Sequence, residues 1–256
     1  MIPAPVQKLR VATYNVHGCV GMDRRRSEAR IAEVIAESSV DIIGLQELDL
    51  GRRRSAGVDQ TRMIADQLGW HSHFHPAMER DDERYGNAIL SRYPLVFRRA
   101  IELPGVPPFF CRENRAALGV DIETNVGPVH IINTHLGLGW RERMLQVQLF
   151  ASAEWRSVIA ADTPLILLGD FNSLRGSRPY RTLNRHLRDV RTLIQATGRM
   201  STFPTRFPTL TVDHVFVNEA LQPLNVIVHR SPLARMASDH FPLVTELVLS
   251  RQRCRH

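Results

Sequence analysis

Short apolar segments that alternate with helical segments constrain the fold of this chain more than any other feature. Apolar and β-branched runs typical of buried strands occupy residues 9–16, 40–45, 88–91, 116–124, 129–134, 165–169, 212–217, 226–228 and 242–249. Apolar residues recur at helical spacing in residues 27–38, 61–68, 141–160 and 177–187. Strands outnumber helices, and a turn signal at residues 125–128 joins two strands directly. The pattern therefore predicts an α/β sandwich with mixed sheets.

The length and composition indicate one domain with its own core. The chain has 256 residues, of which 43% are hydrophobic, and a domain of this size forms a core without disulfides. We predict an N-terminal extension at residues 1–8, a single domain at residues 9–250 and a basic C-terminal tail at residues 251–256. No apolar run reaches the roughly 18 residues of a membrane span, and residues 1–10 lack the apolar region of a secretory signal. These features, with three scattered cysteines, predict a cytoplasmic location.

The charge of the chain predicts an anionic partner. The formal net charge is +7, and Lys8 is the only lysine, so arginine carries nearly all the positive charge. Arginine suits phosphate geometry, although a GC-rich genome would produce the same bias. DNA, RNA or an anionic membrane in peripheral contact would each be a partner of this kind. Charge alone does not separate nucleic acid from lipid, and no segment indicates an obligate protein partner.

Polar residues stand directly at the ends of the predicted strands. They are Asn15, Glu47, His135, Asp170, Asn172, Asp213 and the pair Asp239-His240. Strand ends can aim side chains into a shared cleft. Taken singly, Asn15 is typical of a turn, and Asp170 with Asn172 is typical of an Asx-turn or a helix cap. Because so many strand ends carry such residues, the pattern as a whole predicts one functional site.

The residue types at these positions indicate a reaction. Glu47, Asp170, Asn172 and Asp239 offer hard oxygen ligands, which favour Mg²⁺ or Mn²⁺ over zinc. The imidazoles of His135 and His240 can exchange protons with a phosphate or an attacking water. The chain has no G-x-G-x-x-G or Walker A loop, which argues against a dinucleotide enzyme or a P-loop ATPase. Without a Ser or Cys nucleophile motif, the set fits metal-assisted hydrolysis of a phosphoester.

Seven short motifs resemble the endonuclease/exonuclease/phosphatase superfamily, which includes pancreatic-type deoxyribonucleases, apurinic endonucleases, bacterial sphingomyelinases and inositol-polyphosphate phosphatases. They are residues 12–17 (ATYNVH), 45–47 (LQE), 86–91 (GNAILS), 133–136 (NTHL), 169–172 (GDFN), 212–216 (VDHVF) and 238–242 (SDHFP). The resemblance implies a four-layer α/β/β/α sandwich, with two mixed β-sheets flanked by helices and the site at one end of the sheets. Residues 136–143 and 202–208 resemble a group of uncharacterised bacterial members.

The resemblance also implies metal ligands. Glu47 resembles the principal ligand of Mg²⁺ or Mn²⁺, assisted by Asn15 and Asp239. Asp170 and Asn172 would hold the attacking water, the scissile phosphate or a second metal, since members of the superfamily differ at this point.

Further roles follow from the same resemblance. His240 resembles the catalytic imidazole, oriented by Asp213, and His135 would donate to a non-bridging phosphate oxygen. A carboxylate in the position of Asp213 would fix the imidazole tautomer and stabilise the imidazolium.

Three supporting residues have alternatives that stay open at this point. Arg115 would clamp the substrate phosphate, or form a surface salt bridge with Glu113. Asn87 would support the phosphate-binding cleft, or serve a turn. Glu83 matches an acidic partner of His135 in deoxyribonucleases, or is a solvated loop acid.

Two segments bear on the substrate. Arginines recur at helical spacing after Asn172, which predicts either a basic stripe along a nucleic-acid backbone or a solvated helix face: Arg175, Arg178, Arg181, Arg185, Arg188 and Arg191. Residues 104–110 form an apolar loop that would contact bases or a bilayer if exposed, and would be core if buried.

The expected function is a Mg²⁺-dependent phosphodiesterase, most simply a nuclease that cuts by direct attack of water. The alternatives are a phospholipid-headgroup phosphodiesterase or a phosphomonoesterase. A catalytically silent, basic nucleic-acid-binding protein is a third class, which the intact set of candidate residues disfavours.

Overall fold

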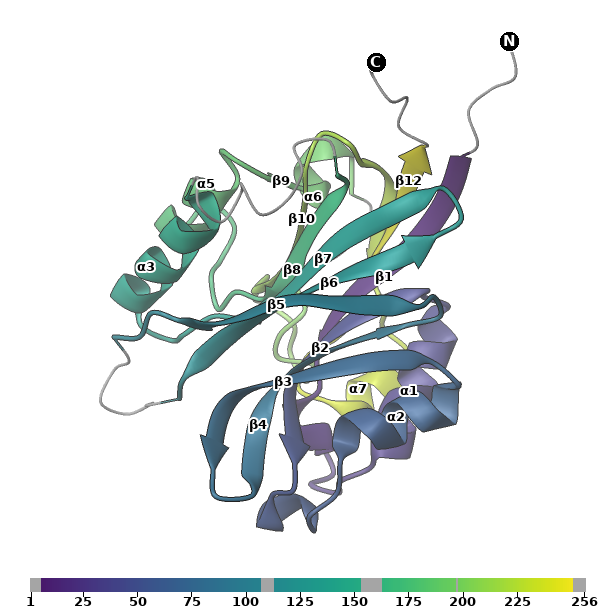
Figure 1. Cartoon of the computed structure of the whole chain (residues 1–256), viewed down its shortest axis with the longest axis vertical. Coiled ribbons are helices and arrows are strands. Elements are labelled where there is room, and N and C mark those ends of the chain that lie inside the picture. Colours follow the sequence, from purple (N-terminus) through teal and green to yellow (C-terminus); the bar gives the residue numbers. More distant parts are fainter. Residues whose placement is uncertain (1–5, 107–112, 153–162, 197, 251–256) are drawn as a thin grey trace.

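Two six-stranded sheets form the body of the protein (Figure 1). The computed structural model describes residues 6–106, 113–152, 163–196 and 198–250. Sheet 1 has the order β11-β12-β1-β2-β4-β3, and its strands are β1 (Val6–Asn15), β2 (Ile42–Leu50), β3 (His71–Arg80), β4 (Glu83–Ser91), β11 (Gln222–Val228) and β12 (Leu243–Ser250). Sheet 2 has the order β5-β6-β7-β8-β10-β9, and its strands are β5 (Leu95–Leu103), β6 (Arg115–Thr124), β7 (Gly127–His135), β8 (Leu165–Asp170), β9 (Arg188–Asp189) and β10 (Asp213–Val217).

Helices flank both sheets, as the four-layer prediction requires. They are α1 (Glu28–Ser38), α2 (Gln60–Leu68), α3 (Trp140–Ala151), α5 (Arg178–Leu183), α6 (Val190–Leu193) and α7 (Pro232–Ala237), with 3-10 turns η1 (His17–Cys19) and η2 (Arg53–Ser55). In Figure 1, α1, α2 and α7 lie together beside sheet 1, and α3 and α5 lie together beside sheet 2. The α/β/β/α sandwich predicted from the resemblance is confirmed.

Capping residues mark the ends of the first two helices. The Ser27 side chain accepts a hydrogen bond from the Arg30 backbone N–H at the start of α1, and Asp59 does the same for Arg62 at the start of α2. Gly69 ends α2 in the left-handed conformation with φ 67°, which glycine adopts at little cost. Both helices were predicted nearly to the residue from their apolar spacing.

Three apolar layers hold the four structural layers together. Alternation along β8 shows how one strand serves two of them, because Ile166 and Leu168 face the space between the sheets. Leu165 and Leu167 face α3 and α5 on the other side. A third core joins sheet 1 to α1, α2 and α7. The central strands of each sheet are thus buried on both faces, which explains their continuous apolar runs.

The strand order brings functional strand ends to one edge. β1 and β2 are parallel, with Asn15 opposite Gln46, and β7 and β8 are parallel, with His135 opposite Asp170. The antiparallel β10 begins with Asp213 opposite Asp170. Parallel neighbours end on the same side of a sheet. Polar side chains from both sheets therefore meet at one end of the sandwich.

Several sequence predictions need correction. Strands β3 and β5 were missed, because their residues are mostly half-buried or exposed and lack a clear apolar alternation. Residues 6–8 were assigned to an extension, yet they pair with residues 248–250 of β12. The helix predicted at residues 177–187 is only α5, and that predicted at residues 141–160 is α3, residues 153–160 lying outside the described part. The tail at residues 251–256 and residues 107–110 of the apolar loop also lie outside it.

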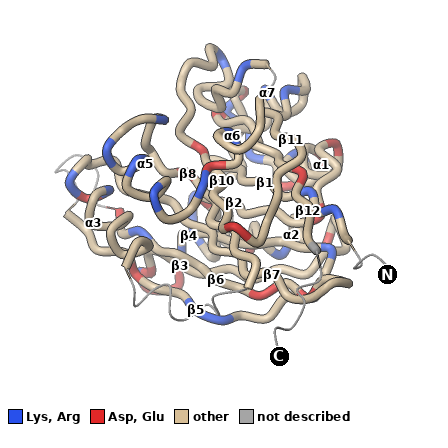
Figure 2. Tube along the Cα trace, turned by 90° about the horizontal axis from the view of Figure 1, so that it is seen from above, with Lys and Arg blue, Asp and Glu red and all other residues tan. Residues whose placement is uncertain are grey.

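The predicted arginine stripe is not one helix face. Only Arg178 and Arg181 of that set lie in α5, while Arg188 lies in β9 and Arg191 in α6. Arg191 is buried, and its guanidinium contacts Asp189 and His214. In Figure 2, Lys and Arg positions are spread over α5, β5 and the region near α7. The sequence could not distinguish a buried arginine from a solvated one of the same spacing.

Among the described residues, no helix is both long enough and apolar enough to span a bilayer.

Gly169 is a position where a side chain should not fit. Its φ is 151°, and a Cβ atom there would stand 1.9 Å from the Thr134 carbonyl oxygen. Gly169→Ala should lower the free energy of unfolding by about 3 kcal/mol, because backbone strain and a clash with main chain add together. Urea denaturation measures this. Gly57→Ala is the matched control, because Gly57 has φ 72° and no atom within 4 Å of that position, so about 1 kcal/mol is expected. Equal losses in the two variants would contradict the account.

Candidate active site

A β-bulge in β2 directs Glu47 to the edge of sheet 1. The register between β2 and β4 shifts between Leu45 and Leu48, and Glu47 adopts φ 65°. Such bulges change the direction in which a side chain points. The preceding residue, Gln46, is fully buried and donates to Asn133 Oδ1 of sheet 2 (2.7 Å). Gln46 thus connects the two sheets by a hydrogen bond, and the next residue, Glu47, lies at the site.

Three neighbouring strands of sheet 2 deliver a row of titratable groups. His135, Asp170 and Asp213 occupy paired positions on β7, β8 and β10. Directly after β8, the backbone N–H of Asn172 donates to Asp170 Oδ1 (2.9 Å), and Asn172 has φ 47°. This Asx-turn returns the Asn172 side chain toward β7, where its amide donates to the Leu136 carbonyl (2.9 Å).

The amide of Asn15 connects the two sheets at the site. Its Nδ2 donates to Glu47 Oε1 (2.8 Å) in sheet 1 and to Asp170 Oδ2 (3.1 Å) in sheet 2. Its Oδ1 accepts from the His17 backbone N–H (3.0 Å). In this orientation the Asn15 oxygen does not face the carboxylates. Asn15 therefore links two candidate carboxylates here, and it would have to rotate its amide to act as the metal ligand that we expected.

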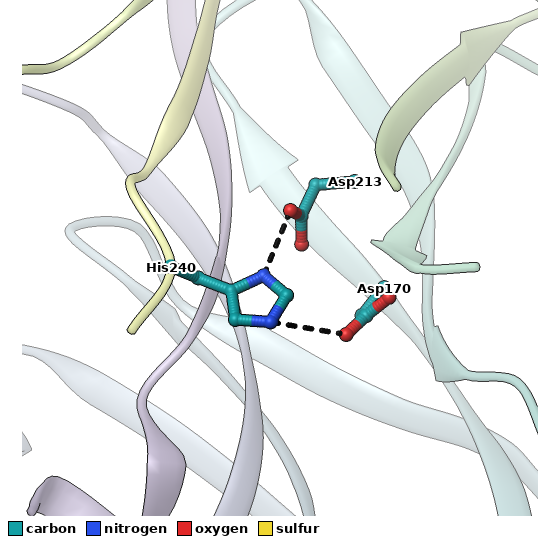
Figure 3. A group of neighbouring side chains, drawn as sticks. All are labelled: Asp170, Asp213 and His240. Atoms are coloured by element: carbon teal, nitrogen blue, oxygen red, sulfur yellow. Dashed lines mark hydrogen bonds and ion pairs between the residues drawn. The ribbon is translucent and has the colours of Figure 1, made fainter. Parts of the chain in front are cut away.

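His240 lies between two carboxylates (Figure 3). Its Nδ1 donates to Asp213 Oδ2 (2.9 Å), and its Nε2 lies 3.7 Å from Asp170 Oδ2. Burial lowers the pKa of His240, but the charge and hydrogen bond of Asp213, with Asp170 and Asp239, outweigh burial and raise it to about 10. The ring also packs on Phe203, with centroids 4.6 Å apart. The imidazolium is therefore held in one orientation with its Nε2 hydrogen toward Asp170.

Asp170 is a buried carboxyl group whose pKa is raised. Burial and the nearby charge of Asp213 raise its pKa to about 7, although His240 and hydrogen bonds from Asn172 and Asn15 oppose the shift. A buried carboxylate in this condition favours a proton, a cation or a polarised water beside it.

His135 is a neutral imidazole held by an arginine. Arg115 Nη1 lies 3.0 Å from His135 Nδ1, and because a guanidinium only donates, Nδ1 is the acceptor and Nε2 carries the hydrogen. That Nε2 lies 3.6 Å from Asp170 Oδ2. Burial, Arg115 and His240 all lower the pKa of His135 well below its usual value. His135 is thus a neutral imidazole whose Nε2 lies 3.1 Å from Asn172 Nδ2, so the Nε2–H becomes available as a donor when that amide rotates.

Arg115 and Asn87 also lie at the interface of the sheets. Arg115 is 4% exposed, and its Nη2 pairs with Glu113 Oε2 (3.1 Å). The pairing foreseen with Glu113 is present, but the arginine is buried and also reaches His135. Asn87 is buried and donates to the Ala116 carbonyl of β6 (3.0 Å), a contact between the sheets rather than within a turn.

Glu83 does not reach His135, so that prediction is wrong. Its Oε1 accepts from the Arg53 backbone N–H (3.1 Å), and its carboxylate pairs with the side chains of Arg52 and Arg53. Glu83 begins β4 at the hairpin with β3, four residues before Asn87. At about 3.3 Å per residue, this places it roughly 13 Å farther along the strand.

The carboxylates of Glu47 and Asp239 fit a divalent metal. Glu47 is half-buried and Asp239 retains 28% side-chain exposure, so both keep oxygen atoms available beside the end of β1. The Ser238 hydroxyl donates to the Asn15 carbonyl oxygen (2.8 Å), which fixes Asp239 next to Asn15. Hard oxygen donors of this kind suit Mg²⁺.

A second set of potential ligands consists of Asp170, Asp213 and His240, whose ligand atoms lie within 4.8 Å of one another. A metal there would need the lone pair of His240, whereas the raised pKa of that ring favours its protonated form. We therefore interpret this set as a hydrogen-bonded acid and its carboxylates.

Sequence reasoning missed a buried cluster behind Asp213. Arg191 Nη2 donates to the Asp213 carbonyl oxygen (3.1 Å) and pairs with Asp189 (2.9 Å). His214 contacts both residues and also donates from Nε2 to the Ser173 carbonyl (2.7 Å). Burial alone would raise the pKa of Asp189, but His214 and Arg191 lower it below its usual range. No signal in the sequence separates Asp189 and Arg191 from surface charges.

A pocket of about 380 Å³ opens beside the catalytic candidates. Its lining combines Arg143, Asn172, Ser173, Ser177 and His240 with apolar Leu174, Phe203, Leu210 and Val212. Arg143 Nε and Ser173 Oγ are buried without a hydrogen-bond partner among the described residues. The pocket thus offers both apolar surface and unused polar groups next to His240.

The profile of the Endonuclease/Exonuclease/phosphatase family matches residues 12–240, which include every candidate described above. The chain belongs to this family. The family groups phosphohydrolases, which supports a hydrolase. A relative from Escherichia coli (strain K12), Uncharacterized protein YbhP, is 29% identical over 258 residues, covering 94% of this chain and 96% of YbhP.

Solved structures of the family share the fold. A family protein from Bacteroides thetaiotaomicron has a TM-score of 0.80 at 20% identity, covering 97% of this chain and 100% of its own. The mannosyl-6-phosphatase Bt3783 of Bacteroides thetaiotaomicron VPI-5482 has a TM-score of 0.76 at 22% identity, covering 93% and 99% respectively. At these identities the likeness establishes the architecture.

The raised pKa of His240 predicts a pH-dependent stability in metal-free protein. The folded-state pKa of about 10 exceeds the ordinary imidazole value of roughly 6.5. Protonation of His240 therefore stabilises the fold fully below about pH 6.5, and this contribution is lost as the pH rises toward 10. Asp213→Asn removes the main group that raises the pKa. In EDTA, the Tm of the unsubstituted protein should fall more between pH 7 and 9.5 than that of the variant, and parallel curves would contradict this assignment.

Proposed function

We propose that this protein is a Mg²⁺-dependent phosphodiesterase that hydrolyses its substrate by metal- and histidine-assisted attack of water. The observation that carries the proposal is His240, held by Asp213 with its Nε2 toward Asp170 at the site where Glu47 and Asp239 also lie. Glu47 and Asp239 would hold the cation, which supplies Lewis-acid polarisation of a phosphoryl oxygen when bound.

Asp170 and Asn172 are suited to position the attacking water. Asp170 Oδ2 lies 3.7 Å from His240 Nε2 and 3.6 Å from His135 Nε2, spacings too long for good hydrogen bonds. An oxygen atom from water or phosphate can therefore join these groups more favourably than they join each other. The raised pKa of Asp170 makes it a better proton acceptor than an ordinary carboxylate.

The two histidines have different tasks in this scheme. Asp213 keeps His240 protonated, so its Nε2–H can donate to a phosphate oxygen or to the leaving group. His135 is neutral, and with Arg115 at its Nδ1 its Nε2–H would donate to a non-bridging oxygen once the Asn172 amide, whose Nδ2 lies 3.1 Å from Nε2, turns away. Arg115 acts on the phosphate through His135 in this arrangement, because its Nη2 is paired with Glu113.

A nuclease is the simplest form of this function and the first to test, and the net charge of +7 suits nucleic acid as it suits any anionic substrate. The arginine stripe no longer supports it, since those side chains do not share one face. One observation favours the second candidate, a phospholipid-headgroup phosphodiesterase: the pocket next to His240 has apolar walls formed by Leu174, Phe203 and Leu210. Such walls suit an organic group better than a hydrated phosphate backbone.

Substitution of His240 tests the proposal. With Mg²⁺ and bis(p-nitrophenyl) phosphate, His240→Gln should reduce kcat by about 100-fold or more, since a lost general acid typically costs that much. The control is His71→Gln, because His71 is exposed on β3 at the end of sheet 1 away from Glu47, and it should retain activity. EDTA should abolish turnover, and Mg²⁺ or Mn²⁺ should restore it.

A panel of duplex DNA, single-stranded DNA, RNA, phospholipids and sugar phosphates then assigns the substrate, with His240→Gln as the background in each case. Turnover that survives either chelation or the His240 substitution would refute the proposed chemistry.

A further inference from the structure

Three loops around the pocket carry large apolar side chains on their outer surfaces. We call them together the apolar rim: Leu138 and Trp140 before and at the start of α3, Leu174 after β8, and Phe207 and Leu210 before β10. Trp140 is 57% exposed and Phe207 is 69% exposed. Exposed apolar side chains that gather in one region, unlike single ones, indicate a surface that contacts something outside the protein.

Contacts place the three loops at the same pocket. Leu174, Leu210 and Arg143 line it directly. Arg143 Nη1 donates to the Leu138 carbonyl (2.5 Å), which joins the first loop to the pocket wall. Phe203 and Leu210 form a β-bridge, and Phe207 lies at the tip between them, its N–H donating to the Pro204 carbonyl (3.1 Å). Two rim residues, Leu174 and Leu210, therefore line the pocket that contains His240, and the loops that carry the other rim residues adjoin its wall.

Arginines flank both aromatic residues of the rim, and the acidic Glu142 that follows Arg141 in α3 is buried. Arg141 lies over the Trp140 ring at 5.4 Å, and Arg206 lies over the Phe207 ring at 5.7 Å. The loop residues 136–140, 173–177 and 203–210 contain no Asp or Glu. Aromatic tips flanked by arginines match an interface in which apolar groups enter an acyl layer and cations meet anionic headgroups.

We propose that the apolar rim docks the protein on an anionic lipid surface and so presents the pocket to a headgroup phosphodiester. This inference deepens the proposed function, on which its substrate class rests, while the docking itself does not require turnover. Single-stranded nucleic acid is the competing partner, because it also binds aromatic and basic surfaces. Leu138, Leu174 and Leu210 favour lipid, since aliphatic side chains offer no ring on which a base can stack.

Vesicle sedimentation tests the docking. Vesicles of phosphatidylglycerol and phosphatidylcholine should bind the protein in EDTA, where no metal-dependent turnover occurs. Vesicles of phosphatidylcholine alone should bind about tenfold or more weakly, because arginines near the surface lose their anionic partners. Trp140→Ser with Phe207→Ser should weaken binding to the anionic vesicles by about tenfold or more.

The matched control is Phe97→Ser. Phe97 is 47% exposed and lies on β5. The end of β5 near the site is marked by Leu103, which pairs with Arg115, and Phe97 lies toward the opposite end of this strand. This variant should bind the anionic vesicles as the unsubstituted protein does. Tm values confirm that the variants fold, and if the double variant melts early, Trp140→Ser and Phe207→Ser are compared singly.

Two results would overturn the proposal: equal vesicle binding by the rim variants and the unsubstituted protein, or absence of binding to the anionic vesicles. Single-stranded DNA binding that the rim variants lose would then assign the rim to nucleic acid. Turnover of bis(p-nitrophenyl) phosphate by the unsubstituted protein is measured separately. Vesicle docking without that turnover would overturn the proposed function and leave the docking proposal intact. Turnover without vesicle docking would overturn the docking proposal and leave the proposed function intact.

Discussion

The amide of Asn15 is the contact on which the arrangement of the site depends. By donating to Glu47 and Asp170 at once, it holds together two carboxylates that belong to different sheets and would otherwise repel each other. The surrounding contacts fix this amide from both sides, since His17 binds its oxygen and Ser238 binds the carbonyl of the same residue. One polar residue thereby sets the relative position of groups from the two halves of the sandwich.

Several carboxylates lie close together at the site, and the histidines are not equally close to each of them. Asp213 is compensated by a direct hydrogen bond to His240, whereas Asp170 faces two imidazole nitrogens only at longer range. Burial makes that imbalance expensive and raises the pKa of Asp170. Asp170, which also accepts hydrogen bonds from Asn15 and Asn172, is placed to bind water or phosphate between the two imidazoles. Burial of the Asp170 carboxylate therefore costs folding stability, while the raised pKa suits Asp170 to accept a proton, as is typical of functional sites.

The sequence predicted the strands that deliver the site better than the strands at the sheet edges. β1, β7 and β8 are buried on both faces, so their apolar runs end visibly at Asn15, His135 and Asp170. β3 and β5 have exposed faces with His71 or Arg98 among their residues, and no periodic pattern marked them. The α/β class followed from the pattern, and the four-layer arrangement followed from the resemblance of the motifs.

Side-chain partners were harder to predict than side-chain positions. The bulge at Glu47 and the orientation of the Asn15 amide depend on contacts between distant segments, which spacing does not contain. The same applies to Arg191. Its burial and its ion pair with Asp189 distinguish it from a surface arginine, and the sequence shows neither. Glu83 shows the opposite error, since a motif match placed it near His135 although the strand carries it away.

The central claim is that the carboxylates on the Glu47 side hold the cation while His240 remains an acid. Crystals grown with Mn²⁺ test this directly, because Mn²⁺ replaces Mg²⁺ at oxygen sites and gives an anomalous diffraction signal. The account predicts an anomalous peak bound by Glu47 and Asp239, with the hydrogen bond between His240 and Asp213 intact. A peak coordinated instead by His240, Asp213 and Asp170 would contradict it, because the imidazole would then be a ligand and could not serve as the proton donor.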